Sequence, residues 1–327
     1  MQIIRVDAFG PAENLRVVEM ESPPLHAGEV RIAASACGVN RADVLQRTGA
    51  YHGPKVMPVF PGREAAGAVA EVGPGVSGFA VGDRVIGFGG RPGCYASEVI
   101  FPVERLVRIP DGVSFEQAAC LPTSWLSAWY TLVRLARLQQ GETVLIQGAA
   151  SAVGHAAVLI ARWRGARPIA TAGSAGKLEW LRGLGAADGI DYSREDVAAR
   201  VAELTGGKGC EVVLDAVGGK AFGASLKALA YGGRCVAMAN VTTEDSVMNT
   251  RDFYPKNAAI YGFQISFLRE KSGWDARPDL AELLALIASG ALRPHVDRTF
   301  PLADAAGAHR WLEERRNRGN VLLVTGR

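Results

Sequence analysis

Residues 143 to 154 read Thr143-Val-Leu-Ile-Gln147-Gly148-Ala-Ala-Ser-Ala-Val-Gly154, and an apolar helical segment follows at 155–164. The first five residues are typical of a buried strand, and small residues stand where the backbone must turn tightly into a helix. The N–H groups at such a helix start suit a pyrophosphate. The alternative is a plain tight turn, because Ser151 and Ala152 stand where glycines are expected. We expect the phosphates of a dinucleotide to contact Ala150, Ser151, Ala152, Val153 and Gly154.

From residue 141 onward, apolar strands alternate with amphipathic helical segments, which is typical of βαβ units and a parallel sheet. The pattern predicts six strands, at 143–147, 168–172, 189–192, 210–217, 234–239 and 259–265. It predicts helices between them at 155–164, 177–184, 195–204 and 221–230. Beyond the sheet it predicts a helix at 278–289, a strand near Phe300, a helix at 302–316 and a strand at 321–324. The fold class is therefore α/β with a doubly wound parallel sheet.

The first 124 residues have a different pattern, with short strand-like runs such as Glu29-Val-Arg-Ile-Ala33 separated by turn residues. Eight glycines lie between Gly73 and Gly93, a spacing that predicts a sharply turning, mostly antiparallel barrel. The segment after residue 265 is too short to form a core of its own. We therefore expect a barrel domain that begins at 1–124, a sheet domain at 125–265, and a segment at 266–327 that returns to the barrel.

The charge balance excludes some classes of partner. The 327 residues carry 36 basic and 33 acidic side chains, a formal net charge of +3. Nucleic-acid or membrane binding by charge alone is therefore not expected. The five cysteines are odd in number, widely spaced and without a C-x-x-C pair, so they form neither a disulfide framework nor a four-cysteine zinc lobe. With a charged N-terminal stretch that lacks a secretory pattern, the expected location is the reducing cytoplasm.

The stretch after the second strand of the sheet indicates which dinucleotide is bound. An NAD site needs an Asp or Glu there, about twenty residues past the glycines, to accept a hydrogen bond from the ribose 2′-OH. This chain reads Thr171-Ala-Gly-Ser-Ala-Gly-Lys177, with no carboxylate. The Ser174 hydroxyl and the Lys177 ammonium suit a 2′-phosphate dianion instead. NADPH is therefore the predicted cofactor, the alternative being that Lys177 is simply a solvated lysine in the first turn of a helix.

Several motifs together resemble the medium-chain dehydrogenase/reductase superfamily, and specifically its zinc-less quinone oxidoreductase branch, the zeta-crystallin-like enzymes. The motifs are Gly38-Val-Asn40-Arg-Ala-Asp43, Arg47-Thr-Gly-Ala-Tyr51, Pro61-Gly-Arg-Glu64-Ala-Ala-Gly67, Val81-Gly-Asp-Arg-Val85, Gly93-Cys-Tyr-Ala-Ser-Glu98, the turn at 149–154 and Leu184-Gly-Ala-Ala-Asp188. The resemblance covers nearly the whole chain. It implies a GroES-like, partly open β-barrel catalytic domain and a Rossmann domain for the cofactor.

The resemblance also constrains the reaction. The zinc alcohol dehydrogenases of the superfamily carry a cysteine and a histidine ligand where this chain has Asn40 and Arg63. An amide and a guanidinium cannot replace a thiolate and an imidazole at a catalytic zinc site, so no metal is expected. Hydride delivery without a Lewis acid suits substrates that are already electrophilic, namely quinones or α,β-unsaturated carbonyl compounds. The alternatives are an enoyl thioester reductase, zinc-dependent alcohol dehydrogenase chemistry, and a cofactor-binding regulatory or RNA-binding protein of the zeta-crystallin type.

The resemblance places four residues in the catalytic site. Asn40 is the first candidate for a hydrogen-bond donor, with a turn residue as its alternative. Tyr51 is expected to donate a hydrogen bond or proton to the substrate oxygen, unless water serves or the ring packs on its loop. Thr123 is expected to bond the nicotinamide carboxamide. Arg63 is expected to pair with Glu64 or another acidic neighbour, or to bind an anionic group of the substrate. Asp43 is expected to order the loop or cap a helix.

Further cofactor contacts follow from the same resemblance. They are expected at Gly173, Ser174, Lys177, Tyr192, Asn240, Phe263 and Arg315, together with Asn40 and Thr123 from the catalytic site. Tyr192 and Arg315 would complete the 2′-phosphate shell, although Arg315 belongs to a basic run that is ordinarily just solvated. The edge strand at 259–265 is expected to pair with its copy in a homodimer.

Overall fold

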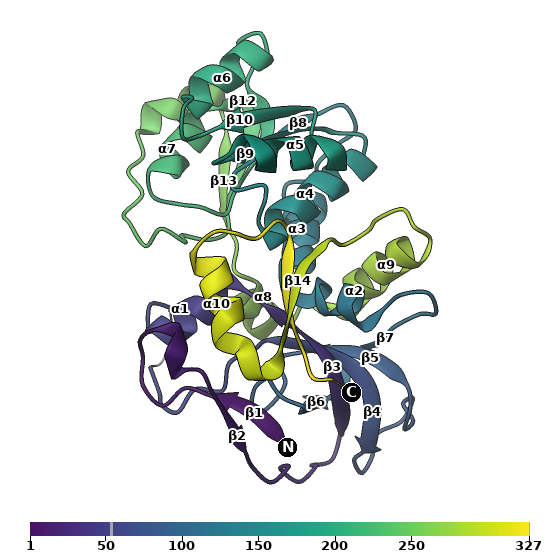
Figure 1. Cartoon of the computed structure of the whole chain (residues 1–327). Helices are drawn as coiled ribbons and strands as arrows, with labels where there is room; N and C mark the ends of the chain where they lie inside the picture. Colours follow the sequence, from purple (N-terminus) through teal and green to yellow (C-terminus); the bar gives the residue numbers. More distant parts are fainter. Residues whose placement is uncertain (53–54, 327) are drawn as a thin grey trace. The chain divides into compact units, whose positions relative to one another are not determined.

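The computed structural model describes residues 1–52 and 55–326 (Figure 1). The chain divides into two compact units. One consists of Met1–Leu126 together with Asp275–Arg327, and the other of Ser127–Trp274. The central unit is called the sheet unit below, and the unit built from the two ends of the chain is called the barrel unit.

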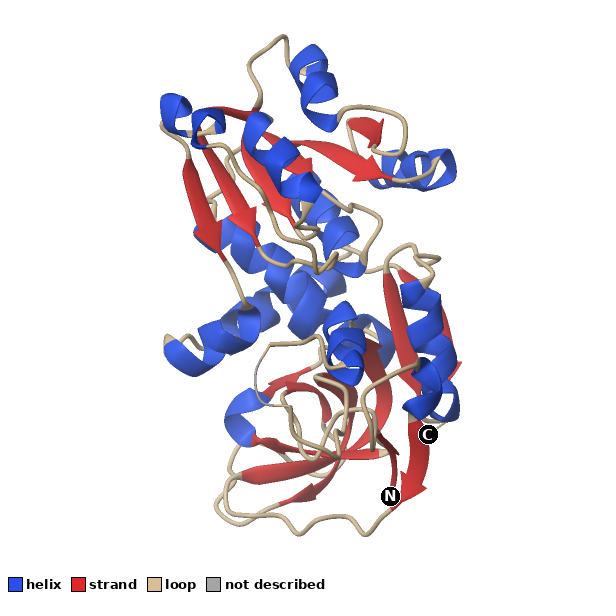
Figure 2. Ribbon diagram, turned by 90° about the vertical axis from the view of Figure 1, so that its left-hand side faces the viewer, coloured by secondary structure: helices blue, strands red, loops and turns tan. Residues whose placement is uncertain are grey.

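The sheet unit contains a six-stranded parallel sheet in the order β10-β9-β8-β11-β12-β13. Its strands are β8 (Thr143–Ile146), β9 (Arg167–Ala172), β10 (Asp188–Asp191), β11 (Cys210–Asp215), β12 (Leu229–Ala237) and β13 (Ala259–Gly262). Its longer helices are α4 (Ala152–Trp163), α5 (Ala175–Leu184), α6 (Val197–Leu204), α7 (Lys220–Lys227) and α8 (Ile265–Lys271). Helices α4 to α7 each connect two strands that follow one another in the chain. Figure 2 distinguishes the helices from the strands by colour. The predicted doubly wound parallel sheet is confirmed.

Some predicted boundaries in this unit are wrong. The helix predicted at 221–230 ends at Lys227, and β12 already begins at Leu229. In the pairing of β12 with β11, Leu229 lies opposite Cys210, but the regular pairing begins only at Arg234. Between these two points the strand is irregular, and Gly232 has a φ of +69°. Apolar and polar residues do not alternate over this irregular first part of β12, so the sequence pattern did not predict it as a strand. The strand predicted at 259–265 ends at Gly262, because Gln264 caps helix α8 by accepting from the Phe267 N–H.

The barrel unit contains a seven-stranded sheet in the order β14-β15-β3-β4-β5-β7, with β6 paired to β3. Its strands are β3 (Glu29–Val39), β4 (Glu64–Val72), β5 (Arg84–Phe88), β6 (Glu98–Pro102), β7 (Leu106–Arg108), β14 (Val296–Pro301) and β15 (Asn320–Val324), and a separate hairpin is formed by β1 (Gln2–Arg5) and β2 (Arg16–Glu19). The late strand β15 pairs antiparallel with β3, which joins the two ends of the chain.

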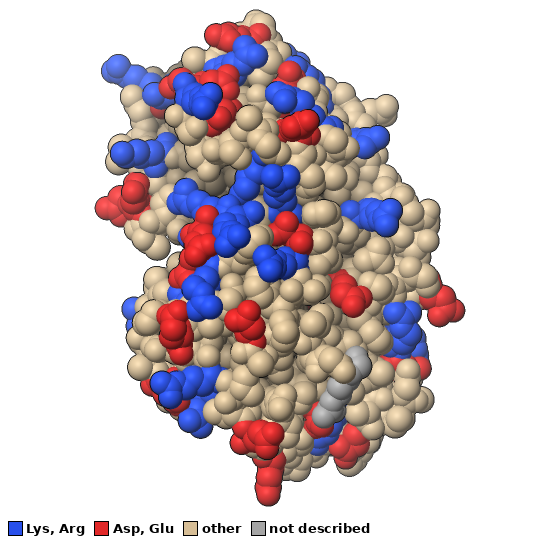
Figure 3. Space-filling view, viewed as in Figure 1, with Lys and Arg blue, Asp and Glu red and all other residues tan. Residues whose placement is uncertain are grey.

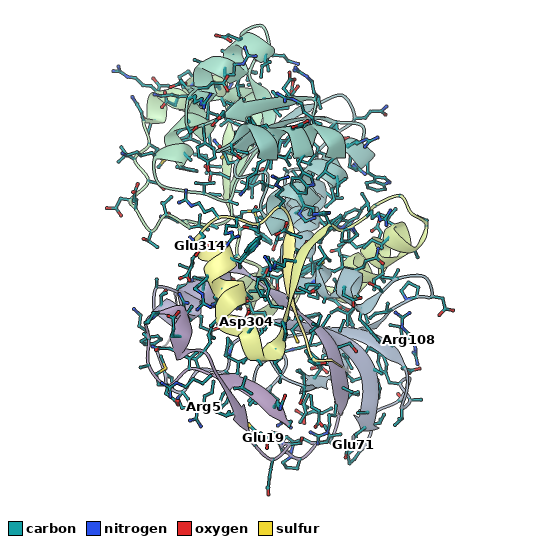
Figure 4. All side chains as sticks on the ribbon, viewed as in Figure 1. Arg5, Glu19, Glu71, Arg108, Asp304 and Glu314 are labelled. Carbon is teal, nitrogen blue, oxygen red and sulfur yellow. The ribbon has the colours of Figure 1, made fainter. Side chains whose placement is uncertain are left out.

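Short helices surround this sheet. They are α1 (Arg41–Thr48), α2 (Phe115–Ala119), α9 (Arg277–Ala288) and α10 (Ala305–Glu313), and α3 (Leu126–Trp129) lies in a helical run from 121 to 135. Asp304 and Glu314, labelled in Figure 4, mark the two ends of α10. The predicted helix at 302–316 is therefore shorter at both ends, because residues 302–304 form a 3₁₀ turn and Arg315 has a φ of +54°.

Strands β3 and β4 approach so closely that one glycine is required between them. A Cβ on Gly67 would lie 2.0 Å from the Ala33 carbonyl oxygen. The core beside these strands is apolar, with Ile32, Val69 and Phe101 almost fully buried. Basic and acidic side chains are interspersed over the face seen in Figure 3. Within the described part of the chain, every helix falls short of the length and hydropathy that a membrane crossing requires.

Candidate functional site

The turn between β8 and α4 has the form that the sequence predicted. Gly148 has a φ of +63°, and Ser151 caps the helix by accepting from the Gly154 N–H at 3.1 Å. Helix α4 begins at Ala152, three positions before the predicted start, because Ser151 serves as its cap. The N–H groups of Ala152 and Val153 therefore belong to the first turn, where a helix offers them no carbonyl partner of its own.

Gly154 has a specific reason to be glycine. A Cβ at this position would lie 2.5 Å from the Gly148 carbonyl oxygen and 2.6 Å from the Ala149 Cα. Both of these are backbone atoms, which cannot rotate away as a side chain can. The first turn of α4 thus packs directly on residues 148 and 149 of the turn that follows β8, and this contact keeps the turn tight.

Four of the residues predicted to contact the cofactor, three of them at its 2′-phosphate, lie together at the ends of β9 and β10. The Tyr192 N–H donates to the Ala172 carbonyl at 3.2 Å, which places Tyr192 beside the residues that follow β9. A Cβ on Gly173 would lie 2.7 Å from the Tyr192 phenol oxygen. Ser174 is the first residue before α5 but its side chain makes no capping bond, and Lys177 lies in the first turn of that helix. The group is open to solvent, since Tyr192 is 45% exposed.

The other predicted cofactor residues are less closely grouped. Asn240 follows β12, and its amide is used within its own loop, donating to the Glu244 carbonyl at 2.7 Å and accepting from Thr242 at 2.8 Å. Phe263 follows β13 and stacks on Tyr130 with ring centroids 5.5 Å apart. Arg315 belongs to the barrel unit rather than to the unit that holds Tyr192.

A buried cluster of polar side chains joins β3, β4 and the segment that contains Thr123. Asn40 directly follows β3 and is the residue before α1. Its amide nitrogen donates to the Glu64 carboxylate at 2.7 Å. Thr123 hydrogen-bonds the same carboxyl group through its hydroxyl and its backbone. Asn40 is 8% exposed and Glu64 is 1% exposed, so this group is largely removed from water.

Asp43 links this cluster to a second set of side chains. One carboxylate oxygen accepts from the Asn40 N–H at 2.8 Å and from the Tyr95 hydroxyl at 3.0 Å. The Tyr95 hydroxyl lies 3.3 Å from the His309 Nε2. The Arg63 Nε lies 3.3 Å from the other Asp43 oxygen. Asp43 thus stabilises the start of α1, as predicted, and Arg63 pairs with this acidic neighbour rather than with Glu64.

Burial controls the protonation of the cluster. It raises the pKa of Glu64 to about 7, against the opposing effect of the hydrogen bonds from Asn40 and Thr123. It also raises the pKa of Asp43, although the Arg63 guanidinium acts in the opposite direction. Burial, and after it the charge of Arg47, lowers the pKa of His309 to about 3. At neutral pH, His309 is therefore uncharged and Glu64 is close to its midpoint.

Three members of this cluster were not predicted as site residues from the sequence. They are Glu64, Tyr95 and His309. Glu64 had a usable signal, because it is a lone carboxylate in the apolar run Glu64-Ala-Ala-Gly-Ala-Val-Ala. A buried charged residue of this kind requires partners. No comparable signal marked Tyr95 or His309, whose contact joins positions 214 residues apart.

The side chains at this cluster do not suit a zinc ion. Asn40 and Arg63 provide an amide and a guanidinium, which are not the thiolate, imidazole or carboxylate ligands that zinc prefers. Among residues 1–52 and 55–326, no group of three or more His, Cys, Asp or Glu side chains could hold a metal ion. All five cysteine thiols are free and buried.

Comparisons with known proteins agree with both units. Residues 26–111 match the alcohol dehydrogenase GroES-like domain, and residues 184–323 match the family described as zinc-binding dehydrogenase. The chain is 35% identical to a quinone oxidoreductase of Pseudomonas aeruginosa, with 98% of each chain covered. Its structure matches the crystal structure of Escherichia coli quinone oxidoreductase complexed with NADPH at a TM-score of 0.91 and 32% identity, covering 99% of this chain and 100% of that one.

A third relative is much longer. The chain is 38% identical to polyketide synthase GfsB of Streptomyces halstedii over 98% of its own length, but spans only 6% of that protein. The similarities over whole chains place this protein in the medium-chain dehydrogenase/reductase superfamily, among the quinone oxidoreductases. The predicted GroES-like domain and Rossmann domain are confirmed, and the protein is an oxidoreductase.

Proposed function

We propose that the protein is an NADPH-dependent reductase that transfers hydride to quinones or α,β-unsaturated carbonyl compounds without a metal. The observation that supports this most is the group of Gly173, Ser174, Lys177 and Tyr192 at the ends of β9 and β10, which offers a hydroxyl, an ammonium and a phenol but no carboxylate. The E. coli quinone oxidoreductase that this chain resembles was crystallised with NADPH.

The sheet unit supplies the groups that would hold this cofactor. First-turn N–H groups of α4 suit the pyrophosphate, and Ser174, Lys177 and Tyr192 suit the 2′-phosphate. When bound, NADPH supplies a hydride. An ion pair between Lys177 and the 2′-phosphate would make the site selective for the phosphorylated dinucleotide.

The barrel unit supplies the groups that would receive the substrate. Hydride addition to an enone or quinone places negative charge on a carbonyl oxygen. One amide hydrogen of Asn40 bonds Glu64, and the second is the donor proposed for that oxygen. The Tyr51 hydroxyl is proposed as a further donor. Because Glu64 and Thr123 fix the Asn40 amide, little reorganisation is needed when the charge develops.

Turnover with a panel of substrates tests the proposed function. Purified protein is expected to oxidise NADPH in the presence of 1,4-quinones or enones, and to prefer NADPH over NADH. The panel includes neutral quinones, neutral enones and enoyl thioesters. A protein that oxidises NADPH with none of these compounds, or that uses NADH better, would contradict the proposal.

Replacing Lys177 with alanine is expected to lower kcat/KM for NADPH by about tenfold to a hundredfold, since a charge-assisted hydrogen bond to the 2′-phosphate is lost. The value for NADH should hardly change, because that dinucleotide lacks the phosphate. Lys227→Ala is the matched control, since Lys227 lies at the opposite end of a connecting helix, the last turn of α7. An equal loss with both dinucleotides would show that Lys177 does not recognise the phosphate.

Enoyl thioesters form a second candidate substrate class. They are the alternative that the sequence resemblance left open, and this chain is also 38% identical to a segment of a polyketide synthase. A thioester carbonyl conjugated to an alkene undergoes the same hydride addition at the β-carbon, so the donors proposed above serve both classes. Comparing kcat/KM for an enoyl thioester with that for a quinone of similar size separates the two assignments.

The protein is also proposed to form a homodimer through the edge of its parallel sheet. Strand β13 is the last strand in the sheet order, and among residues 1–52 and 55–326 no strand pairs with its outer side. Such an edge is a template for pairing with a second copy around a twofold axis. Multi-angle light scattering at micromolar concentration is expected to give twice the chain mass of 34.6 kDa. A mass of a single chain at every concentration would contradict the dimer.

A further inference from the structure

We propose that Arg63 is a positioning residue for Tyr51, held in place by the buried Asp43 carboxylate. The inference rests on the proposed function for its catalytic consequence, because Tyr51 is there a hydrogen-bond donor to the substrate. The arrangement of carboxylate, guanidinium and phenol ring is itself a feature of this chain and is tested separately below.

The anchor of the arrangement is Asp43. Its side chain is fully buried on α1, and its two oxygens have different partners. One oxygen accepts from the Asn40 N–H and the Tyr95 hydroxyl. The other lies 3.3 Å from the Arg63 Nε. A buried carboxylate that accepts two hydrogen bonds is fixed in orientation, and its charge attracts the edge of the guanidinium that faces it as an ion pair.

The face of the same guanidinium lies over Tyr51. The central carbon of the Arg63 guanidinium is 4.5 Å from the Tyr51 ring centroid, within the range of a cation–π contact. A planar guanidinium can bond a carboxylate through its edge and cover a ring with its face at the same time, which a lysine ammonium cannot do. Arg63 is only 21% exposed, so water weakens this contact less than it would on the surface.

The contact contributes to where the Tyr51 hydroxyl points, together with the neighbouring His52 ring, whose centroid lies 4.0 Å from that of Tyr51. Tyr51 follows the left-handed Gly49 that ends α1, and its N–H donates to the Leu45 carbonyl of that helix at 2.9 Å, so α1 holds the Tyr51 backbone but not its ring. The phenol oxygen lies at the far end of the ring, and its position is set by the two side-chain torsions. Stacking on a fixed guanidinium restricts both torsions before substrate arrives, and the donor is then preorganised.

The barrel unit contains a second arrangement of the same chemistry that serves as a control. Arg108 pairs with Asp83 at 2.5 Å and lies over the Phe79 ring at 4.8 Å from its centroid. Arg108 ends β7, where Figure 4 labels it, and is 56% exposed. Phe79 has no hydroxyl, so a change at Arg108 alters a carboxylate–guanidinium–ring contact without altering a hydrogen-bond donor.

The first experiment measures the ring directly and needs no turnover. 3-Fluorotyrosine is placed at position 51, and its ¹⁹F resonance is recorded in the otherwise native protein and in the Arg63→Lys, Arg63→Leu and Arg108→Lys variants. The native resonance is expected to be displaced from its value in urea. In both Arg63 variants it should move toward the urea value, while Arg108→Lys leaves it in place. An unchanged resonance in Arg63→Lys and Arg63→Leu would overturn the proposal.

The second experiment tests whether Arg63 acts through the Tyr51 hydroxyl, using a double-mutant cycle. Arg63→Lys is expected to lower kcat/KM for a neutral quinone or enone by about tenfold, mostly through kcat, in line with the upper range of such contacts. In a Tyr51→Phe background the same change should have no further effect. A loss that persists in that background, or that occurs only with anionic substrates, would show that Arg63 binds substrate directly and would overturn the positioning role.

The two experiments also separate this proposal from the function on which it rests. If the native protein turns over no quinone, enone or enoyl thioester, the proposed function fails, yet the fluorine resonance still reports whether Arg63 positions the ring. If turnover is normal and the resonance does not respond to Arg63, the positioning role fails alone.

Discussion

Gly154→Ala is expected to reduce the affinity for NADPH by about a hundredfold and to destabilise the sheet unit. The added methyl would lie 2.5 Å from the Gly148 carbonyl oxygen and 2.6 Å from the Ala149 Cα, both in the turn proposed to hold the phosphates. The helix must move away from the strand to relieve this overlap, which costs up to about 3 kcal/mol in overpacked sites. Calorimetric titration with NADPH measures the affinity, and urea unfolding measures the stability.

Gly183→Ala is the matched control for this substitution. Gly183 lies in α5 of the same unit, and a Cβ added there meets no atom within 4 Å. Alanine in a helix interior is favoured over glycine by roughly 0.5–1 kcal/mol, so this variant should bind NADPH normally and unfold at slightly higher urea. Normal NADPH binding by Gly154→Ala would show that the turn does not carry the cofactor site.

The same turn shows what the sequence predicts well. A strand, a run of small residues and a helix are local features, so the sheet and its phosphate-binding turn were predictable from residues close together in the chain. The error in the start of α4 comes from a cap. Ser151 was assigned to the turn, and its bond to the Gly154 N–H extends the helix back to Ala152.

The polar cluster shows why the rest was not predictable. Asn40 and Asp43 were noticed because they belong to one short motif, yet their partners come from distant positions. Glu64 bonds Asn40 across 24 residues, and Tyr95 reaches Asp43 across 52. These contacts depend on how β3 and β4 pair and on how α10 packs, which no local pattern specifies. Similarly, the sequence left three partners open for Arg63, namely Glu64, another acidic neighbour or an anionic group of the substrate. The structure places it beside Asp43.

The free energy of unfolding of the native protein is expected to fall as pH rises because of Glu64, and Glu64→Gln is expected to remove this fall. Burial raises the pKa of Glu64 from 4.5 to about 7 in the folded protein. Between these values the unfolded chain has released the proton while the folded chain keeps it, so the free energy of unfolding falls as pH rises. Glutamine has the same shape and no charge to bury. Relative to the native protein, the variant should therefore gain about 3 kcal/mol between pH 4.5 and pH 8.

His309 makes it necessary to measure this as a difference between two proteins. The pKa of His309 is about 3 in the folded protein, and its ordinary value is 6.5. Between these values the unfolded chain binds a proton that the folded chain does not, so the free energy of unfolding rises as pH rises. This slope opposes that of Glu64 up to pH 6.5, and it cancels when the native protein and Glu64→Gln are compared at each pH. Glu71→Gln is the control, because Glu71 is a carboxylate on the same strand, labelled in Figure 4, that is 56% exposed and forms an ion pair with Arg31.

Urea unfolding at half-unit intervals from pH 4.5 to pH 8 gives the two differences. The Glu64→Gln difference should change steeply up to about pH 7 and then level off. The Glu71→Gln difference, recorded in the same way, is the reference curve. A Glu64→Gln difference that does not vary with pH would mean that the carboxyl keeps an ordinary pKa in the folded protein. Asn40 would then face a carboxylate that is fully charged throughout the working range, and the amide would be held more tightly than proposed.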